Sequence, residues 1–341
     1  MTYHIAADIG GTKTLIQLVH KSQQARKTLK HSYYKSGDFE TFEDLLRDFI
    51  DFDENIDSAC FAIAGPIKSK ANNAVADVTN LPWVINQQDI QQNFSINHCK
   101  LINDFQAIGH AIQGLTNQDL ITLQAGTPSP SGTRAVIGAG TGLGQAILVR
   151  TGKSYEVIAT EGGHVNFAPT TALEIELLKF LQSKFSHVSY EMILSGPGLL
   201  NIFDFLLHQN NLQNTEHKQI FNSSDPAAEI AKQANENPNS IYTDVMNLFT
   251  HIYGAQAGNF ALNCLPSGGI YIAGGIAVKN QSLIKSPAFI EAFCAKGIMS
   301  SLASEIPVKL ITHSEPGLIG ATQIAINIAT NTTVSAEHEL N

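Results

Sequence analysis

The chain has 341 residues, a length that favours two domains with separate cores or one large α/β unit split by a cleft. Hydrophobic residues make up 43% and charged residues 15%, which excludes a disordered, collagenous or fibrous protein. The formal net charge is −9 and the sequence contains no basic block, so we expect no nucleic-acid partner and no binding to an anionic membrane.

Cysteine usage and hydropathy indicate a reducing compartment. Cys60, Cys99, Cys264 and Cys294 lie far apart, form no CxxC pair and read as free thiols. No apolar run approaches the roughly 20 residues that span a bilayer, and the N-terminus lacks the basic region of a signal peptide. We therefore expect a cytoplasmic protein.

The first predicted element is a β-hairpin with glycines at its turn. An apolar run over residues 3–8 leads into Gly10-Gly11, and residues 14–19 form the returning strand. An amphipathic helix is predicted over residues 39–50, with Asp38 as its N-cap. Short apolar runs over residues 59–64 and 100–103 predict buried strands.

The middle of the chain repeats this pattern. Residues 124–133 are rich in Gly, Pro and Ser, which places a domain boundary near residues 114–133. Residues 134–138 and 145–150 then flank a second glycine-rich turn. The segments that begin at Asp8 and Gly138 share the order strand, glycine turn, strand, at an offset of 130 residues, which suggests a duplicated unit.

The second half is predicted to be mostly helical, with a long buried helix over residues 241–262. Strands are predicted at residues 269–273 and 308–311, and a closing helix over residues 318–329. Strands interleaved with helices indicate an α/β fold.

Three glycine turns are candidate phosphate sites: Gly10-Gly11, Gly138 to Gly144 and Gly274-Gly275. Backbone N–H groups bind phosphate oxygens, and glycine has no Cβ to keep the anion away. The dinucleotide-binding and P-loop patterns both fail here. The simpler alternative is that these glycines only form tight hairpins.

Asp8 ends the first predicted strand, beside the first glycine turn. A carboxylate next to a triphosphate requires a hard cation between them, and Mg²⁺ prefers oxygen ligands and often keeps its waters. Alternatively, Asp8 caps its own turn.

A set of polar residues has the hydrogen-bonding capacity that a polyhydroxyl ligand needs. Asn103 and Asp104 close a predicted strand, where side chains commonly face a ligand. Glu161, His164 and Glu191 follow, and carboxylates, an amide and a neutral imidazole together accept and donate to hydroxyls. The alternatives are an Asx turn at Asn103, solvated surface carboxylates at Glu161 and Glu191, and a buried structural His164.

Six blocks of this sequence resemble those of the bacterial glucokinase family, in order and over nearly the whole chain. They are Asp8-Ile-Gly-Gly-Thr, Ile102-Asn-Asp-Phe, Gly138-Ala-Gly-Thr-Gly-Leu-Gly, Glu161-Gly-Gly-His, Leu194-Ser-Gly-Pro-Gly and Ala273-Gly-Gly-Ile. The first block alone is shared across sugar kinases and related ATPases, whereas the combination is specific.

The resemblance implies the actin-like ATPase (ribonuclease H-like) fold, with two α/β domains around a cleft. The small domain would comprise residues 1–113 and 317–341, and the large domain residues 114–316. The resemblance also implies ATP-dependent phosphorylation of glucose, the first step of glycolysis, with ATP and Mg²⁺ as cofactors and a homodimer as the assembly.

By the same resemblance, Asp104 is the general base on the sugar 6-hydroxyl, and Asn103, Glu161, His164 and Glu191 hold the remaining hydroxyls. Asp8 would lie near Mg²⁺, through water. The residues implied around ATP are Ala7, Asp8, Ile9, Gly10, Gly11, Thr12, Gly138, Gly140, Thr141, Gly142, Gly274 and Gly275.

Some features depart from the family or leave alternatives open. Lys13 stands where many of these glucokinases carry Asn, yet residues 165–190 contain no cysteine, which favours the zinc-free branch over the zinc-binding sugar kinases. A DNA-binding regulator of this fold would carry a helix-turn-helix segment before the first strand, which begins by Tyr3. A kinase for fructose, mannose or an N-acetylhexosamine remains the alternative. Residues 209–240, rich in Asn and Gln, are predicted to form a variable surface segment.

Overall fold

The computed structural model describes residues 2–22, 25–52, 55–70, 73–152, 154–212 and 219–338. Residues 213–218 of the predicted variable segment and 339–341 of the predicted small domain lie outside these ranges. The chain forms two compact units. Unit 1 comprises Met1–Thr116 and His313–Asn341, and unit 2 comprises Asn117–Thr312.

Unit 1 is built on a five-stranded sheet in the order β3-β2-β1-β4-β8. The first three strands are antiparallel, whereas β1, β4 and β8 run parallel. The predicted hairpin over residues 3–19 is confirmed as β1 and β2. The strand bounds are β1 Thr2–Ile9, β2 Lys13–Lys21, β3 Arg26–Lys35, β4 Ser58–Ile63 and β8 His98–Asn103.

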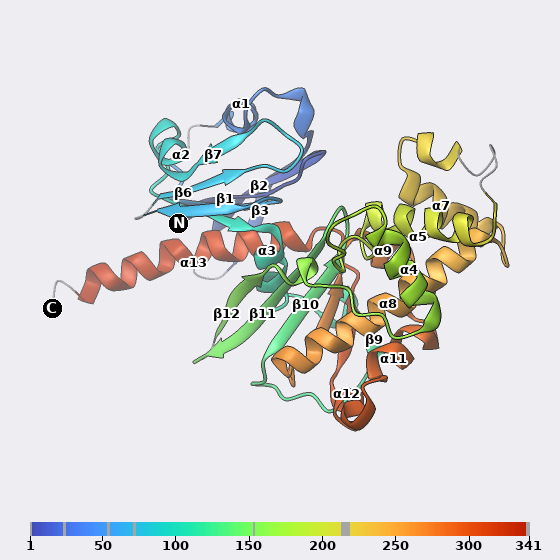
Figure 1. Cartoon of the computed structure of the whole chain (residues 1–341). Coiled ribbons are helices and arrows are strands. Elements are labelled where there is room, and N and C mark those ends of the chain that lie inside the picture. Colours follow the sequence, from blue (N-terminus) through green and yellow to red (C-terminus); the bar gives the residue numbers. More distant parts are fainter. Residues whose placement is uncertain are drawn as a thin grey trace. The chain divides into compact units, whose positions relative to one another are not determined.

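Both faces of this sheet are covered (Figure 1). Ile5, Phe61 and their neighbours on one face share a hydrophobic core with helices α1 and α2 and with a second sheet, ordered β5-β6-β7. Ala6 and Ala62 on the other face pack with α13 and α3. The remaining elements of unit 1 are η1 Ser36–Asp38, α1 Phe42–Phe49, β5 Ile67–Lys70, β6 Asn73–Asp77, β7 Val84–Asn86, α2 Gln87–Asn93, α3 Asp104–Ala111 and α13 Pro316–His338.

Unit 2 is built on a six-stranded sheet in the order β12-β11-β10-β13-β14-β9. Here β10, β11 and β12 are antiparallel, and β10, β13 and β14 run parallel. The strand bounds are β9 Leu120–Gln124, β10 Arg134–Ala139, β11 Leu143–Thr151, β12 Ser154–Thr160, β13 Ile270–Ala273 and β14 Val308–Ile311.

The helices of unit 2 gather around α8, which is buried along most of its length and packs against α5, α7 and α11 (Figure 1). Ile137 and Ile272 of the sheet belong to the same hydrophobic core. The helix bounds are η2 Asn117–Asp119, η3 Gly162–His164, α4 Ala172–Gln182, α5 Gly196–Gln209, η4 Gln219–Asn222, α7 Pro226–Glu236, α8 Ile241–Cys264, α9 Gly275–Lys279, α10 Gln281–Ile284, α11 Pro287–Cys294, η5 Gly297–Met299 and α12 Ser300–Glu305.

The two units repeat one strand order. In each, the first strand of an antiparallel three-strand run lies at the sheet centre and pairs in parallel with the next strand of the main sheet: β1 with β4, and β10 with β13. This order agrees with the duplicated unit suggested by the repeated glycine hairpin. The packing of α13 on β1, β4 and α3 supports our proposal that the end of the chain belongs to the small domain.

The prediction that Asp38 is the N-cap of the helix over residues 39–50 is wrong. Asp38 lies in η1, and α1 begins after Thr41, whose hydroxyl accepts a hydrogen bond from the Asp44 N–H at 3.2 Å. Phe39 is extended, and its carbonyl accepts a hydrogen bond from the Trp83 indole N–H at 3.2 Å. This contact between residues distant in sequence places Phe39 outside the helix.

Gly320 allows α13 to lie close to α3, because a Cβ there would overlap the carbonyl oxygen of Ala107. We expect Gly320→Ala to lower the free energy of unfolding by about 1–3 kcal/mol through overpacking, although alanine favours helix. Chemical denaturation measures this. Gly37→Ala is the control, because no described heavy atom lies within 4 Å of its Cβ position. An equal stability of the two variants would contradict the close helix contact.

Candidate active site

In unit 1, three parallel strands end at the same edge of the sheet. Ile9, Ile63 and Asn103 are in register across β1, β4 and β8. Asp8 therefore lies at the carboxyl end of β1, and Asp104 directly follows β8. The carboxyl ends of parallel strands are where ligands of open α/β sheets bind.

Asn103 fixes the start of α3 as its N-cap. Its amide oxygen accepts hydrogen bonds from the N–H groups of Phe105 at 2.9 Å and Gln106 at 3.4 Å. The local capping role considered from the sequence is thus present. It places Asp104 at the first position of α3, where one carboxylate oxygen accepts the Phe105 N–H at 2.9 Å.

Burial, and next the negative charge of Asp8, raise the pKa of Asp104 to about 6. Hydrogen bonds from the main chain and from Asn103 act in the opposite direction. At neutral pH this carboxylate is ionised, yet it is a stronger base than an ordinary aspartate. It has the protonation behaviour that a general base needs.

Asp8 has a similar environment. Burial raises its pKa to about 6, the positive charge of Lys13 opposes the rise, and the negative charge of Glu315 adds to it. The carboxylate lies against Gly317 in the first turn of α13, where a Cβ would overlap a carboxylate oxygen. Gly317, which no sequence motif marks as a site residue, therefore makes room for Asp8.

The turn between β1 and β2 is closed by a hydrogen bond from the Gly10 N–H to the Lys13 carbonyl at 2.9 Å. Gly11 must be glycine because a Cβ would lie 2.5 Å from the Thr79 carbonyl oxygen. Thr12 is exposed at the turn. Ala7 and Ile9 belong to the hydrophobic core, so neither contributes a side chain to this turn.

In unit 2, β10 and β13 end together, since Gly138 is in register with Ala273. Gly140, in the turn after β10, and Gly275, the first residue of α9, have no described heavy atom within 4 Å of their Cβ positions. Gly274 has φ of +87°, and a Cβ there would overlap the Ala139 main chain. Gly274 therefore serves packing, whereas Gly140 and Gly275 face open space.

Tyr253 of α8 holds these two strand ends together. Its fully buried hydroxyl accepts the Ala139 N–H at 3.2 Å and lies 3.3 Å from the carbonyls of Ile137 and Ala273. This role is not predictable from the sequence, because an aromatic residue in an apolar helix signals only burial.

Glu161, His164 and Glu191 come together in unit 2. The His164 Nε2 lies 3.9 Å from a Glu161 carboxylate oxygen, and the Nδ1 lies 3.8 Å from one of Glu191. The exposed fraction is 87% for Glu161, 60% for His164 and 32% for Glu191, so the cluster is open to a ligand. The buried-histidine alternative is wrong.

The two glycines of the Glu161-Gly-Gly-His164 block pack η3 against β11. A Cβ at Gly162 would overlap the Gln145 side chain, and one at Gly163 would overlap the Leu143 carbonyl. This close packing brings His164 beside Glu191. Glycine is required here by the neighbouring strand.

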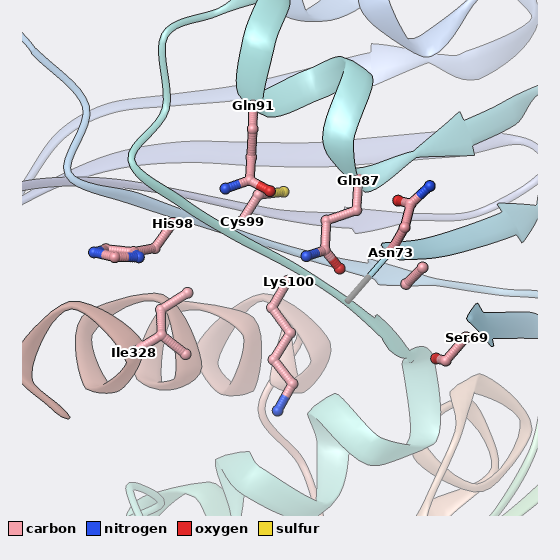
Figure 2. Close-up of a pocket in the computed structure, with 9 residues that line it drawn as sticks. Ser69, Asn73, Gln87, Gln91, His98, Cys99, Lys100 and Ile328 are labelled. Carbon is pink, nitrogen blue, oxygen red and sulfur yellow. The ribbon is translucent and has the colours of Figure 1, made fainter. Parts of the chain in front are cut away.

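Unit 1 also contains a cavity of about 500 Å³ along the edge strand β8, between α2 and α13. Figure 2 shows His98 and Lys100 on β8 and Gln87 and Gln91 on α2 around it. None of the predicted site residues lines this cavity. The complete lining is Ser69, Asn73, Ala74, Gln87, Gln91, His98, Cys99, Lys100 and Ile328.

The described part of the chain contains no group of three or more His, Cys, Asp or Glu side chains that could hold a metal ion. The four cysteines are free thiols. No helix within the described ranges is long and apolar enough to cross a membrane.

The sequence model of the family described as Glucokinase matches residues 5–328. The chain belongs to the glucokinase family. A glucokinase from a Nostoc species is 41% identical over 346 residues, covering 96% of this chain and all of that protein. The family membership inferred from the six motif blocks is confirmed.

Solved structures confirm the fold. The crystal structure of a glucokinase from an Antarctic psychrotroph has a TM-score of 0.82 and 32% identity, and the match covers 96% of this chain and 99% of that one. A ROK family glucokinase from Streptomyces griseus, in complex with glucose and AMPPNP, has a TM-score of 0.63 and 18% identity, covering 95% and 99%. The predicted actin-like ATPase fold is therefore correct.

The raised pKa of Asp104 predicts how its replacement changes stability. Between about pH 4 and pH 6 the folded chain holds a proton at Asp104 that the unfolded chain has already released. The contribution of Asp104 to the free energy of unfolding therefore becomes less favourable as the pH rises through this range. We expect Asp104→Asn to melt about 2–4 °C higher than wild type at pH 8. The difference should shrink as the pH falls through 6 and vanish near 4. A lower melting temperature at pH 8 would contradict the electrostatic assignment.

Proposed function

We propose that the chain transfers the γ-phosphoryl group of ATP to the 6-hydroxyl of D-glucose, the first step of glycolysis. The family match over residues 5–328 and the glucokinases that match nearly end to end support this reaction. The observation that carries the proposal is Asp104, a carboxylate at the carboxyl end of β8 with a pKa of about 6.

Asp104 would accept the proton of the 6-hydroxyl as that oxygen attacks phosphorus. Phosphoryl transfer requires alignment of the attacking oxygen and neutralisation of charge, and no covalent nucleophile. One Asp104 oxygen is engaged by the Phe105 N–H, which fixes the orientation of the carboxylate. The other oxygen would face the hydroxyl.

The donor set at Asp8 fits Mg²⁺. A half-buried carboxylate whose pKa is raised by burial gains from a nearby cation. Mg²⁺ is commonly held by one or two carboxylates, substrate phosphates and waters. When bound, it would neutralise charge on the phosphates, and Asp8 would hold it through water.

The glycine turns would bind the phosphates of ATP through main-chain N–H groups. Gly140 and Gly275 support this role because they face open space, and Gly10, Gly11 and Thr12 form a turn beside Asp8. In unit 2, Thr141 and Gly142 complete the proposed nucleotide turn, and Gly138 and Gly274 shape the strand ends.

The remaining sugar hydroxyls would bind to Asn103, Glu161, His164 and Glu191. The three unit 2 side chains support this role because they form one accessible cluster. A site that pairs each hydroxyl with a polar group discriminates strongly, since a sugar that lacks the hydroxyl leaves its partner unsatisfied. As the family implies, we also infer a cytoplasmic homodimer.

Asp104→Asn tests the base. We expect kcat to fall by about 10²- to 10⁴-fold, because the amide cannot accept the proton. The glucose Kd, measured by calorimetry, should stay close to that of wild type, since an amide at this position would keep the shape of the site. Asp38→Asn, at an exposed position of η1, is the control and should keep wild-type kcat. If the kcat of Asp104→Asn equals that of wild type, Asp104 is not the general base.

A sugar panel tests the substrate. We expect Mg²⁺- and ATP-dependent phosphorylation of glucose, with kcat/KM at least about 10-fold lower for fructose, mannose, galactose and N-acetylglucosamine. Product formation with each sugar is measured in parallel. A clear preference for another sugar would be consistent with the proposed phosphoryl transfer, but it would contradict the hydroxyl contacts assigned to Glu161, His164 and Glu191.

A further inference from the structure

The carboxylate of Glu191 contacts both proposed binding regions of unit 2. One oxygen accepts a hydrogen bond from the Leu143 N–H at 2.8 Å. The other lies 3.8 Å from the His164 Nδ1. Leu143 directly follows the glycine turn 140–142, and His164 belongs to the cluster proposed to bind sugar hydroxyls. A single rigid, planar group therefore joins the two regions.

The main chain on both sides of this link is fixed. Within the turn, the Gly140 N–H donates to the Gly142 carbonyl at 2.8 Å, and the Gly140 carbonyl accepts the Gly196 N–H at 2.8 Å. At Glu191, the N–H donates to the Gly163 carbonyl at 2.9 Å and the carbonyl accepts the Ser195 hydroxyl at 2.7 Å. The Glu191 side chain is therefore the part of the link that can reorient.

Position 142 accommodates the Glu191 carboxylate only because it is glycine. A Cβ at Gly142 would lie 2.5 Å from the Glu191 oxygen that accepts the Leu143 N–H. At Gly140, two residues earlier, no described heavy atom lies within 4 Å of the Cβ position. The lack of a side chain therefore serves a different purpose at each position: Gly140 leaves space for a ligand, and Gly142 leaves space for the Glu191 carboxylate.

We propose that Glu191 is a positioning residue that couples sugar binding to the shape of the nucleotide turn, with Gly142 as the position that admits its carboxylate. The inference rests on the proposed function, in which the turn binds phosphate and the cluster binds the sugar. A sugar hydroxyl that donates to the His164-facing oxygen restricts the carboxylate. The other oxygen then holds the Leu143 N–H, and with it the turn, in one geometry. Thermodynamic linkage requires the nucleotide to favour sugar binding by the same factor.

The coupling factor is the ratio of the glucose Kd without nucleotide to the glucose Kd with saturating Mg²⁺ and a non-hydrolysable ATP analogue. Calorimetry on the full chain measures both. We expect wild type to show a factor of about 5 or more. Glu191→Ala should weaken glucose binding and reduce the factor to near 1. Glu191→Gln, which retains an acceptor oxygen for Leu143, should weaken glucose binding and restore most of the factor.

Glu161→Ala is the matched control. Glu161 also faces His164, at 3.9 Å, but it has no hydrogen bond to the turn within the described residues. Its replacement should weaken glucose binding and keep the wild-type coupling factor. If Glu161→Ala and Glu191→Ala reduce the factor equally, loss of any sugar contact is sufficient and the bridge is ruled out.

The turn provides a second test, which stays informative if Glu191→Ala fails to fold. A methyl at position 142 displaces the Glu191 carboxylate, so Gly142→Ala should weaken glucose binding about 10- to 100-fold without any nucleotide present. Gly140→Ala should leave that Kd unchanged and weaken only the nucleotide. Circular dichroism checks that each variant is folded. Equal glucose affinity of the two alanine variants would overturn the proposal.

The wild-type measurements separate this inference from the proposed function. Absence of glucose phosphorylation would reject the proposed function. Glucose phosphorylation by a wild-type chain with a coupling factor near 1, or an unchanged factor in Glu191→Ala, would reject only the role of Glu191.

Discussion

Both units depend on one steric constraint at the end of a central strand. β1 lies between β2 and β4, and β10 lies between β11 and β13, so the chain must leave each strand through a tight turn with main chain close by. At Gly11, in the turn after β1, a Cβ would collide with the Thr79 carbonyl, and at Gly274, directly after β13, a Cβ would collide with Ala139 at the end of β10. Glycine at these two positions lets neighbouring main chain approach the end of the central strand.

The carboxyl ends of the parallel strands in unit 1 carry two carboxylates in surroundings that destabilise their charged forms. Asp8 and Asp104 are both partly buried, burial raises the pKa of each, and the charge of Asp8 raises that of Asp104 further. The hydrophobic cores on both faces of the sheet and the cap at Asn103 hold the two carboxylates in place. Partly buried carboxylates that lower stability and have raised pKa values are typical of functional sites.

Where local chemistry decides a structure, the sequence predicted it well. The hairpin around Gly10-Gly11 and the long helix now seen as Ile241–Cys264 follow from apolar periodicity and turn residues. Asp38 failed as an N-cap because Trp83, distant in sequence, holds Phe39 extended. Strand β3 was not predicted, since its sequence Arg26–Lys35 is largely polar and exposed and carries little apolar signal.

The sequence by itself determined the family, the fold class and the polar residues of the candidate site, because short ordered motifs preserve both residue type and spacing. Only the tertiary structure decided what each residue contacts. Gly140 and Gly142 are equivalent in the sequence, yet one faces open space and the other the Glu191 carboxylate. Tyr253 and Gly317 gain their roles in the same way. Distances between residues far apart in the chain are set by packing, and packing depends on the whole unit.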